Sequence, residues 1–414
     1  MGIVQKKRRT KALRKILALS DGGIHRIQIF DNFQRTDNSP KRNLETDFVF
    51  YNRSSRPEMK KVRDLLELFA SRYPKHEVGE LVKRLRSSDD VHFRSASFEL
   101  FLHEALRSQG FQLTPHPELP NGRSSRPDFL VRDKAGEEFY LEAKLASENN
   151  ALDKGGEDRI GGVLDTLSAF PHQNFMVFMT QDGSPKSTPS GKKLVGKIHN
   201  WLDELDPDVV ARQIEDEGFD SLAPFAWSHD GWDIQVRPVP LSHERRGKSL
   251  NLIGGSGIGG GFVDAWSPIR DAVRAKGNKY GELGKPLVVA INLDSFNLDR
   301  IDEVQALFGQ EQYLVKPGTT EKPEMRRAPN GVWLGKVGPT YTRVSAVWIF
   351  NDLHASSLAN RRNTVYFNPW AKHAAPGSLK LFPHSSVDDV TINWCEGLSI
   401  REVFDLSEDW PGSE

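Results

Sequence analysis

The chain of 414 residues is long enough for two or three domains, and its content of 37% hydrophobic and 27% charged residues excludes a disordered protein. Its 56 basic and 56 acidic residues cancel, which excludes a uniformly basic surface of the histone kind and requires segregated charge for any nucleic-acid binding. The sequence contains no apolar run long enough to span a bilayer, which argues against a membrane partner, and the single cysteine, Cys395, excludes an intramolecular disulfide and suits a reducing cytoplasm.

Residues 1–94 are expected to form a basic arm followed by a helical region. Residues 6–15 carry seven basic side chains and no acidic one, so this arm either adds salt-dependent phosphate contacts or forms a solvated tail. Over residues 56–86, apolar side chains recur at helical spacing. The helices that they predict are expected to pack on a neighbouring core, with their apolar stripe buried.

A further helix is expected over residues 95–108, just before a Gly-Phe pair. Its buried face is marked by apolar residues at helical spacing, namely Phe98, Phe101, Leu102, Ala105 and Leu106. Glu99 lies beside that face, so its carboxylate is expected to reach a sheet packed against the helix. Glu104 is a second acidic candidate on the same helix.

Two segments that each contain an apolar run lie on either side of a charged, glycine-containing segment. They are residues 126–131 (RPDFLV) and 139–144 (FYLEAK). This pattern predicts a β-hairpin. If the turn centres on residue 135, antiparallel pairing places Asp128 opposite Glu142, with their Cβ atoms roughly 5 Å apart. Because side chains alternate along a strand, Glu142 and Lys144 share one face. Two carboxylates at this separation can hold one cation, whereas a shift of one residue in register would abolish the arrangement.

Together these residues resemble the PD-(D/E)xK nuclease superfamily, which includes restriction endonucleases, Holliday-junction resolvases and repair nucleases. The match comprises the Pro-Asp pair at Asp128, the Glu-Ala-Lys tripeptide that ends at Lys144, and Glu99 on a preceding helix, over about residues 95–181. The resemblance implies a restriction-endonuclease-like α/β core, with a mixed sheet flanked by helices. It also implies a metal-dependent nuclease that hydrolyses DNA, and roles in bacterial restriction or antiphage defence are consistent with the family.

By this resemblance, Asp128 and Glu142 would be the primary ligands of Mg²⁺ or Mn²⁺, and Glu99 would add a ligand or bind a metal-bound water. Hard carboxylate oxygens suit these ions, which keep positions open for phosphate and water. Lys144 would orient or deprotonate the attacking water, or stabilise the developing charge. Arg126 would extend a surface for the nucleic-acid backbone.

The sequence leaves two ways to complete the core. In the simpler one, the buried strand expected over residues 174–180 belongs to a nuclease core of residues 95–185, and residues 186–414 form a carboxy-terminal α/β region. In the other, a helix and a buried strand close the core around residues 265–295. Residues from about 150 to 265 would then be a large insertion.

If the core closes late, Lys276 and Tyr280 lie on one face of its helix, because they are four residues apart. This pair looks similar to the Gln-x-x-x-Tyr helix beside the metal site of some family members, with Lys in place of Gln, and both residues are expected to contribute to nucleic-acid binding. The glycine run at residues 254–261 is expected to be a flexible loop, since it lacks the Gly-Lys-Ser/Thr ending of a phosphate-binding loop.

Two other functions stay open. Glu-x-Lys on a strand is typical of a solvated surface pair, so the chain could be a catalytically inactive nucleic-acid-binding or scaffold module of the same fold. A hydrolase that acts on nucleotides is a weaker alternative. The expected partner is DNA, and a protein partner or a second copy of the chain is compatible with the sequence.

Overall fold

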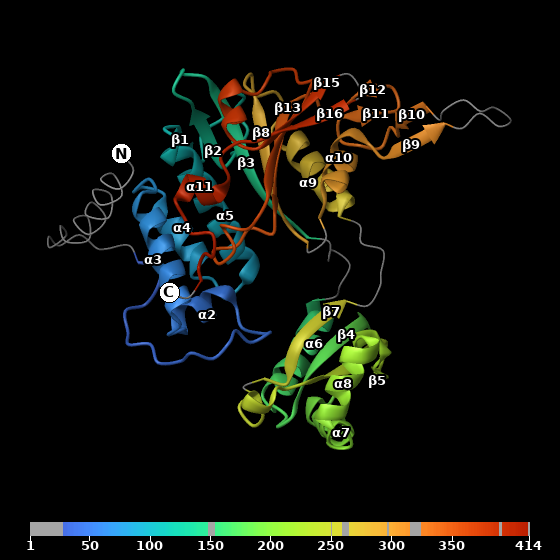
Figure 1. The fold of residues 1–414 in the computed structure, drawn as a ribbon. Helices are drawn as coiled ribbons and strands as arrows, with labels where there is room; N and C mark the ends of the chain where they lie inside the picture. Colours follow the sequence, from blue (N-terminus) through green and yellow to red (C-terminus); the bar gives the residue numbers. More distant parts are fainter. Residues whose placement is uncertain are drawn as a thin grey trace, which may run out of the picture.

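The computed structural model describes most of the chain, and the basic arm expected at residues 6–15 lies outside the described ranges. These are residues 28–147, 154–249, 251–258, 265–295, 298–314, 324–388 and 391–412. Within them, no helix is both long and apolar enough to cross a membrane. The protein has an α/β fold in which helices flank a mixed, many-stranded sheet (Figure 1).

The centre of the fold is an eight-stranded mixed sheet. Its strands follow the order β1 (Gln112–Pro115), β2 (Phe129–Arg132), β3 (Glu138–Ser147), β8 (Leu287–Asp294), β13 (Val344–Asn351), β14 (Asn363–Phe367), β15 (His384–Asp388) and β16 (Thr391–Cys395). The strand β8 pairs in parallel with β3 and β13, whereas β2 pairs antiparallel with β1 and β3. All of β8 except its last residue is buried, as expected of a parallel strand covered on both faces.

Helices cover both faces of this sheet. One face carries α2 (Asp47–Arg53), α3 (Pro57–Ser71), α4 (Val78–Leu85), α5 (Asp90–Ser108) and α11 (Ile400–Phe404), and the other carries α9 (Trp266–Lys279) and α10 (Arg300–Phe308). Because side chains alternate along a strand, Val288 and Ala290 of β8 pack in the core on the α5 face, and Val289 and Ile291 pack in the core on the α9 face. The sheet is therefore the middle layer of three.

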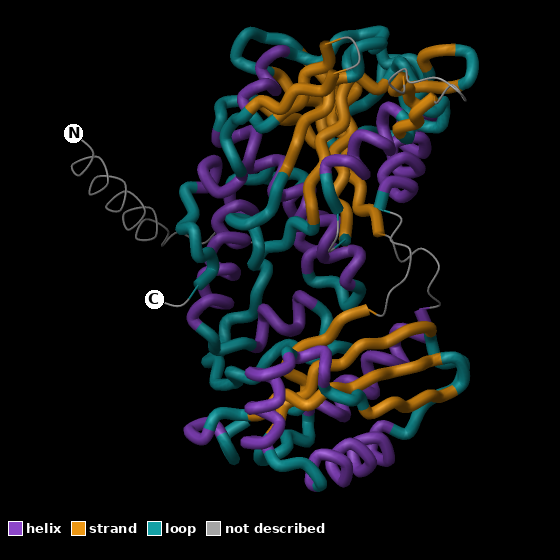
Figure 2. Tube along the Cα trace, turned by 45° about the vertical axis from the view of Figure 1, so that its right-hand side comes forward, coloured by secondary structure: helices purple, strands orange, loops and turns teal. Residues whose placement is uncertain are grey.

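A second sheet belongs to the segment between β3 and α9, and Figure 2 shows it as a separate group of strands. Its strands follow the order β5 (Phe225–His229), β6 (Trp232–Pro240), β4 (Phe175–Gly183) and β7 (Ile253–Ile258), and it is accompanied by α6 (Lys154–Ser168), α7 (Gly191–Asp203) and α8 (Pro207–Glu217). These elements share their own hydrophobic cluster, and we call residues 154–258 the insert. Two further strand pairs are β9 (Glu311–Leu314) with β10 (Glu324–Arg327) and β11 (Leu334–Gly335) with β12 (Gly338–Pro339).

This arrangement corrects the simpler way of completing the core. The strand expected over residues 174–180 is β4, which pairs with β6 and β7 of the insert, so a core that ends at residue 185 is wrong. The large sheet continues from β3 to β8, against which α9 packs, as the closure around residues 265–295 requires. The expected loop at the glycine run is also corrected for residues 254–258, which belong to β7, where Gly255 lies against the ring of Phe178, and the rest of the run lies outside the described residues.

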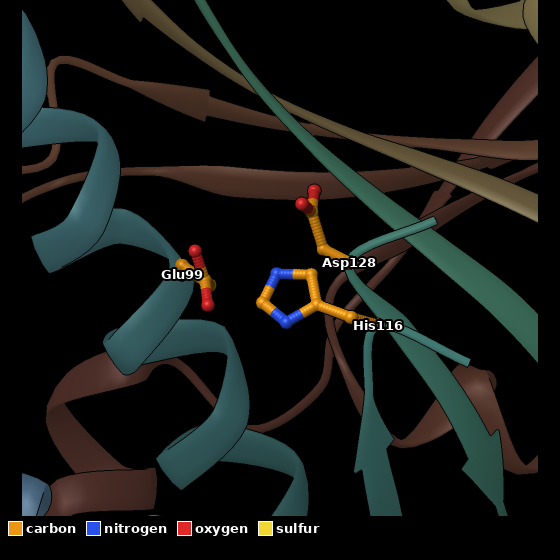
Figure 3. Close-up of side chains that lie close together, drawn as sticks. All are labelled: Glu99, His116 and Asp128. Atoms are coloured by element: carbon orange, nitrogen blue, oxygen red, sulfur yellow. The ribbon is translucent and has the colours of Figure 1, made fainter. Parts of the chain in front are cut away.

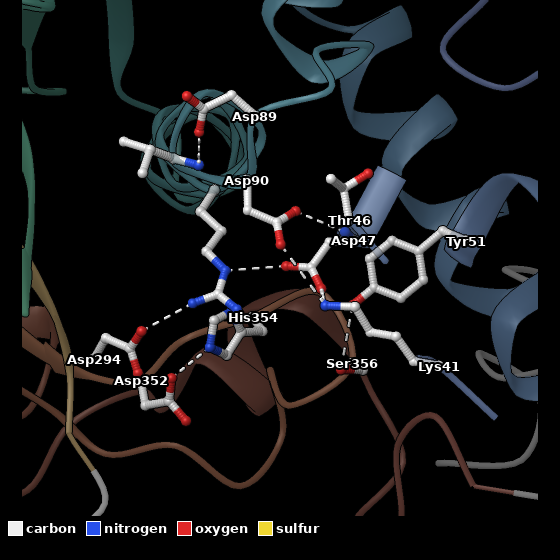
Figure 4. Close-up of polar contacts among 12 residues, drawn as sticks. Lys41, Thr46, Asp47, Tyr51, Asp89, Asp90, Asp294, Asp352, His354 and Ser356 are labelled. Atoms are coloured by element: carbon white, nitrogen blue, oxygen red, sulfur yellow. Dashed lines mark hydrogen bonds and ion pairs between the residues drawn. The ribbon is translucent and has the colours of Figure 1, made fainter. Parts of the chain in front are cut away.

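Charged side chains fix α5 against the carboxyl end of β8 (Figure 4). Arg94 of α5 pairs with Asp47 of α2 at 3.0 Å and with Asp294, the last residue of β8, at 2.9 Å. Burial opposes ionisation of Asp47, but Lys41 and Arg94 outweigh it and hold the pKa of Asp47 below its usual value. These contacts set the position of the helix that carries Glu99.

Candidate active site

The β2–β3 hairpin has the register that the sequence predicted. Phe129 pairs with Leu141, so the preceding residue, Asp128, comes opposite Glu142 when the ladder is continued by one position. In the turn, Gly136 has a φ of 88°, a conformation that glycine adopts without the steric cost of a Cβ. The relative placement of the two acidic positions is therefore as expected.

Asp128 stands just before β2, and its carboxylate is held by the neighbouring strand. The backbone N–H of Ala143 donates to Asp128 Oδ2 at 2.6 Å. Burial, followed by repulsion from Glu142 and Glu99, raises the pKa of Asp128 to about 7. Two other carboxylates thus lie close enough to oppose its ionisation, and a bound cation would relieve that repulsion.

Glu142 is buried on the face of β3 that α9 covers, since it alternates in step with Tyr140, a member of the core on that face. One of its carboxylate oxygens is paired with the ammonium of Lys276 and lies 3.4 Å from that of Lys279. Its other oxygen accepts a hydrogen bond from the hydroxyl of Tyr280. The side chains of α9 and its C-cap therefore neutralise Glu142, and Lys276 is in the side-chain contact that late closure of the core requires.

The other residues predicted for the site lie around Glu142 and its partners from α9. Lys144 is exposed, and its pKa is lowered because the protein partly desolvates the ammonium and because Lys276 repels it. The hydroxyl of Tyr280 lies 3.2 Å from the carbonyl oxygen of Arg126, which joins α9 to the segment before β2. The exposed guanidinium of Arg126 pairs with Glu118 at 2.9 Å.

A group of metal-ligand atoms converges around Asp128 from the α5 face of the sheet. Glu99 on α5, His116 after β1 and Asp128 each offer one donor atom, and these atoms lie within 4.8 Å of one another. Figure 3 shows the imidazole of His116 close to both carboxylates. The backbone N–H of His116 donates to the carbonyl oxygen of Asp128 at 2.9 Å, and its φ of 43° lies in the strained left-handed region, which is often found at functional sites.

No pattern in the sequence indicates that His116 would join Asp128. β1 pairs antiparallel with β2, and Pro115 lies opposite Phe129, so the residue after β1 comes beside the residue before β2. Finding His116 from the sequence would have required the pairing of residues 112–115 with β2. The local signal is a lone histidine between Pro115 and Pro117, which is typical of a loop.

Contacts with the loop after α3 and with α4 fix the carboxylate of Glu99 near Asp128 and His116. The hydroxyl of Tyr73 donates to Glu99 Oε1 at 2.6 Å, and Arg84 of α4 pairs with Oε2. Glu104, the second acidic candidate on α5, is instead paired with Arg72 at 2.5 Å and lies outside the cluster. Of the two predicted positions on this helix, the structure therefore brings Glu99 to Asp128.

The donors around Asp128 suit a hard divalent ion. Carboxylate oxygens are ligands of both Mg²⁺ and Mn²⁺, and a neutral imidazole adds preference for a transition metal such as Mn²⁺. Glu99, His116 and Asp128 would hold such an ion. Glu142 differs from the predicted primary ligand because, among the described residues, its carboxylate is not part of the converging donor group and is paired with Lys276 instead.

The raised pKa of Asp128 predicts how the stability of the metal-free protein depends on pH. A carboxyl whose folded-state pKa is about 7 rather than 3.8 stabilises the fold fully below about pH 4, and this contribution is lost as the pH rises through 7. We expect Asp128→Asn to remove it, so the difference in unfolding free energy between the two proteins should change by roughly 2 kcal/mol between pH 5 and pH 8. Urea unfolding in EDTA measures this difference, and an unchanged difference would contradict the assignment.

Comparisons with protein-family models, with curated proteins and with solved structures find no match for this chain. The chemistry of the site rests on the residues described above.

Proposed function

We propose that the protein is a divalent-metal-dependent nuclease that hydrolyses phosphodiester bonds in DNA, with a restriction-endonuclease-like core formed by α5, the strands β1, β2, β3 and β8, and α9. The observation that carries the proposal is the convergence of ligand atoms from Glu99, His116 and Asp128 next to β3, the strand that carries Glu142 and Lys144, on a helix and a hairpin whose order resembles that of the PD-(D/E)xK superfamily. Clustered carboxylates with a nearby amine are what hydrolysis of an anionic ester requires.

When bound, Mg²⁺ or Mn²⁺ would neutralise the phosphoryl oxygens and lower the pKa of an attacking water. Glu99, His116 and Asp128 would hold the ion, because their donor atoms already converge. Binding requires Asp128 to lose its proton, so metal affinity should fall below about pH 7.

We assign to Lys144 the role of acting on the water or the phosphate. It follows Glu142 by two residues on the same face of β3 and is exposed. Its lowered pKa brings the ammonium nearer to the range in which it can exchange a proton with water. In its charged form the same group would attract the phosphodiester, together with Lys279, which is 40% exposed.

A plasmid-nicking assay tests the proposal. The full chain, stripped with EDTA, is incubated with supercoiled plasmid, single-stranded DNA, RNA or free nucleotides, with and without Mn²⁺ or Mg²⁺. We expect cleavage of DNA that depends on added metal. Hydrolysis of nucleotides but not of plasmid would favour a nucleotide hydrolase, and DNA binding without cleavage under any of these conditions would favour the inactive module.

A further inference from the structure

Asp128 lies between two acidic positions that come from opposite faces of the sheet. Glu99 approaches from α5, and Glu142 faces α9. The ligand atoms of Glu99 and Asp128 lie within 4.8 Å of each other, and the hairpin register brings Asp128 opposite Glu142. The arrangement therefore offers two places for positive charge, one shared with Glu99 and His116 and the other shared with Glu142.

The second of these places already contains a cation from the protein. Lys276 is 19% exposed and is paired with Glu142, whose side chain is 2% exposed. Lys279 is 40% exposed and lies farther away, at 3.4 Å. Because Tyr280 occupies the other oxygen of Glu142, the carboxylate is oriented so that one oxygen remains directed at Lys276.

We propose that Lys276 takes the place of a second metal ion, so that the site binds a single divalent ion through Glu99, His116 and Asp128 while the ammonium of Lys276 supplies the positive charge beside Glu142. This inference rests on the proposed function, because it assigns the metal stoichiometry of that same site. Lys276 then determines how many metal ions the protein binds.

The charges support a single ion. Glu99 is paired with Arg84, and Glu142 is paired with Lys276. Among the described residues, Asp128 has no ion-pair partner. One divalent ion would therefore balance Asp128 together with one phosphodiester charge, whereas a second ion beside Lys276 would place like charges together in a buried region.

Counting bound Mn²⁺ tests the inference with a readout other than activity. Isothermal titration calorimetry and the electron paramagnetic resonance signal of free Mn²⁺ are applied to the EDTA-stripped full chain. We expect one ion for the wild type, and two ions for Lys276→Gln and Lys276→Met, because each leaves Glu142 available as a ligand. The matched control Lys279→Met should still bind one ion, and so should Lys276→Arg, which keeps the charge.

Several results separate this inference from the proposed function. Two ions in the wild type would overturn the role of Lys276. One ion in both uncharged Lys276 variants would also overturn it, when circular dichroism shows that these variants are folded. Neither result contradicts the proposed nuclease. The expected stoichiometries without any DNA cleavage would support the role of Lys276 and contradict the nuclease. If the Lys276→Met variant does not fold, the Lys276→Gln variant, which keeps hydrogen-bonding capacity toward Glu142, decides.

Discussion

Replacing Asp128 by asparagine is expected to abolish metal binding and metal-dependent DNA cleavage together. Asp128 belongs to the group of converging ligand atoms, and its carboxylate is also repelled by that of Glu142. The amide that replaces it carries no charge to attract a divalent ion. We expect the cleavage rate to fall by about a hundredfold to a thousandfold, the size of effect seen when a principal electrostatic group of an active site is lost. Calorimetric titration with Mn²⁺ and plasmid nicking measure the two effects on the same sample.

The matched control for this variant is Glu137→Gln. Glu137 lies in the turn of the same hairpin and is exposed, so its replacement removes one negative charge from the hairpin without touching the cluster. Both activities should remain within about twofold of the wild type, because exposed charges contribute little. Metal-dependent cleavage that persists in Asp128→Asn would remove Asp128 from the reaction, and with it the assignment of the active site to Glu99, His116 and Asp128.

Replacing Lys144 by methionine is expected to separate catalysis from metal binding. The methionine keeps much of the aliphatic length but has no ammonium, so cleavage should fall by about a hundredfold to ten-thousandfold, as for the loss of a general acid or base. Mn²⁺ affinity should stay the same or increase, because removing a cation near Glu142 lowers the repulsion of an incoming ion. Single-turnover cleavage and calorimetry give the two quantities.

Lys134→Met controls for the loss of a lysine from this hairpin. Lys134 is exposed in the turn, and its replacement should leave the cleavage rate unchanged. If Lys144→Met cleaves DNA as fast as the wild type, the amine has no part in the reaction. If instead both Lys144→Met and Asp128→Asn bind DNA normally and the wild type never cleaves it, a scaffold or binding module is the better description.

The local geometry of the hairpin could be predicted from the sequence because its determinants are local. Two alternating apolar runs and a turn with Gly136 fix the pairing, and the pairing fixes where Asp128 and Glu142 stand. The helical spacing around Glu99 likewise placed its side chain beside a buried face that packs on the sheet. Each of these inferences uses residues that are neighbours in sequence or joined by one short turn.

The membership of strands in sheets could not be predicted in the same way. β4 and β8 both come from apolar runs with helices beside them, although only β8 is buried along nearly its whole length, and an apolar run carries no information about which strand it pairs with. Pairing across the insert depends on contacts between residues far apart in the chain. For this reason the sequence is compatible with two ways of completing the core, and the strand pairing in the structure distinguishes them.

By itself, the sequence determined the acids and the amine of the site, the hairpin register and the helix that carries Glu99, since short-range periodicity and turn chemistry specify these features. Only the tertiary structure decided what surrounds them. It brought His116 to Asp128 through the pairing of β1 with β2, and it brought Lys276 to Glu142 from a helix 134 residues later in the chain. The electrostatic balance of a buried site depends on distances in space, which spacing along the chain does not encode.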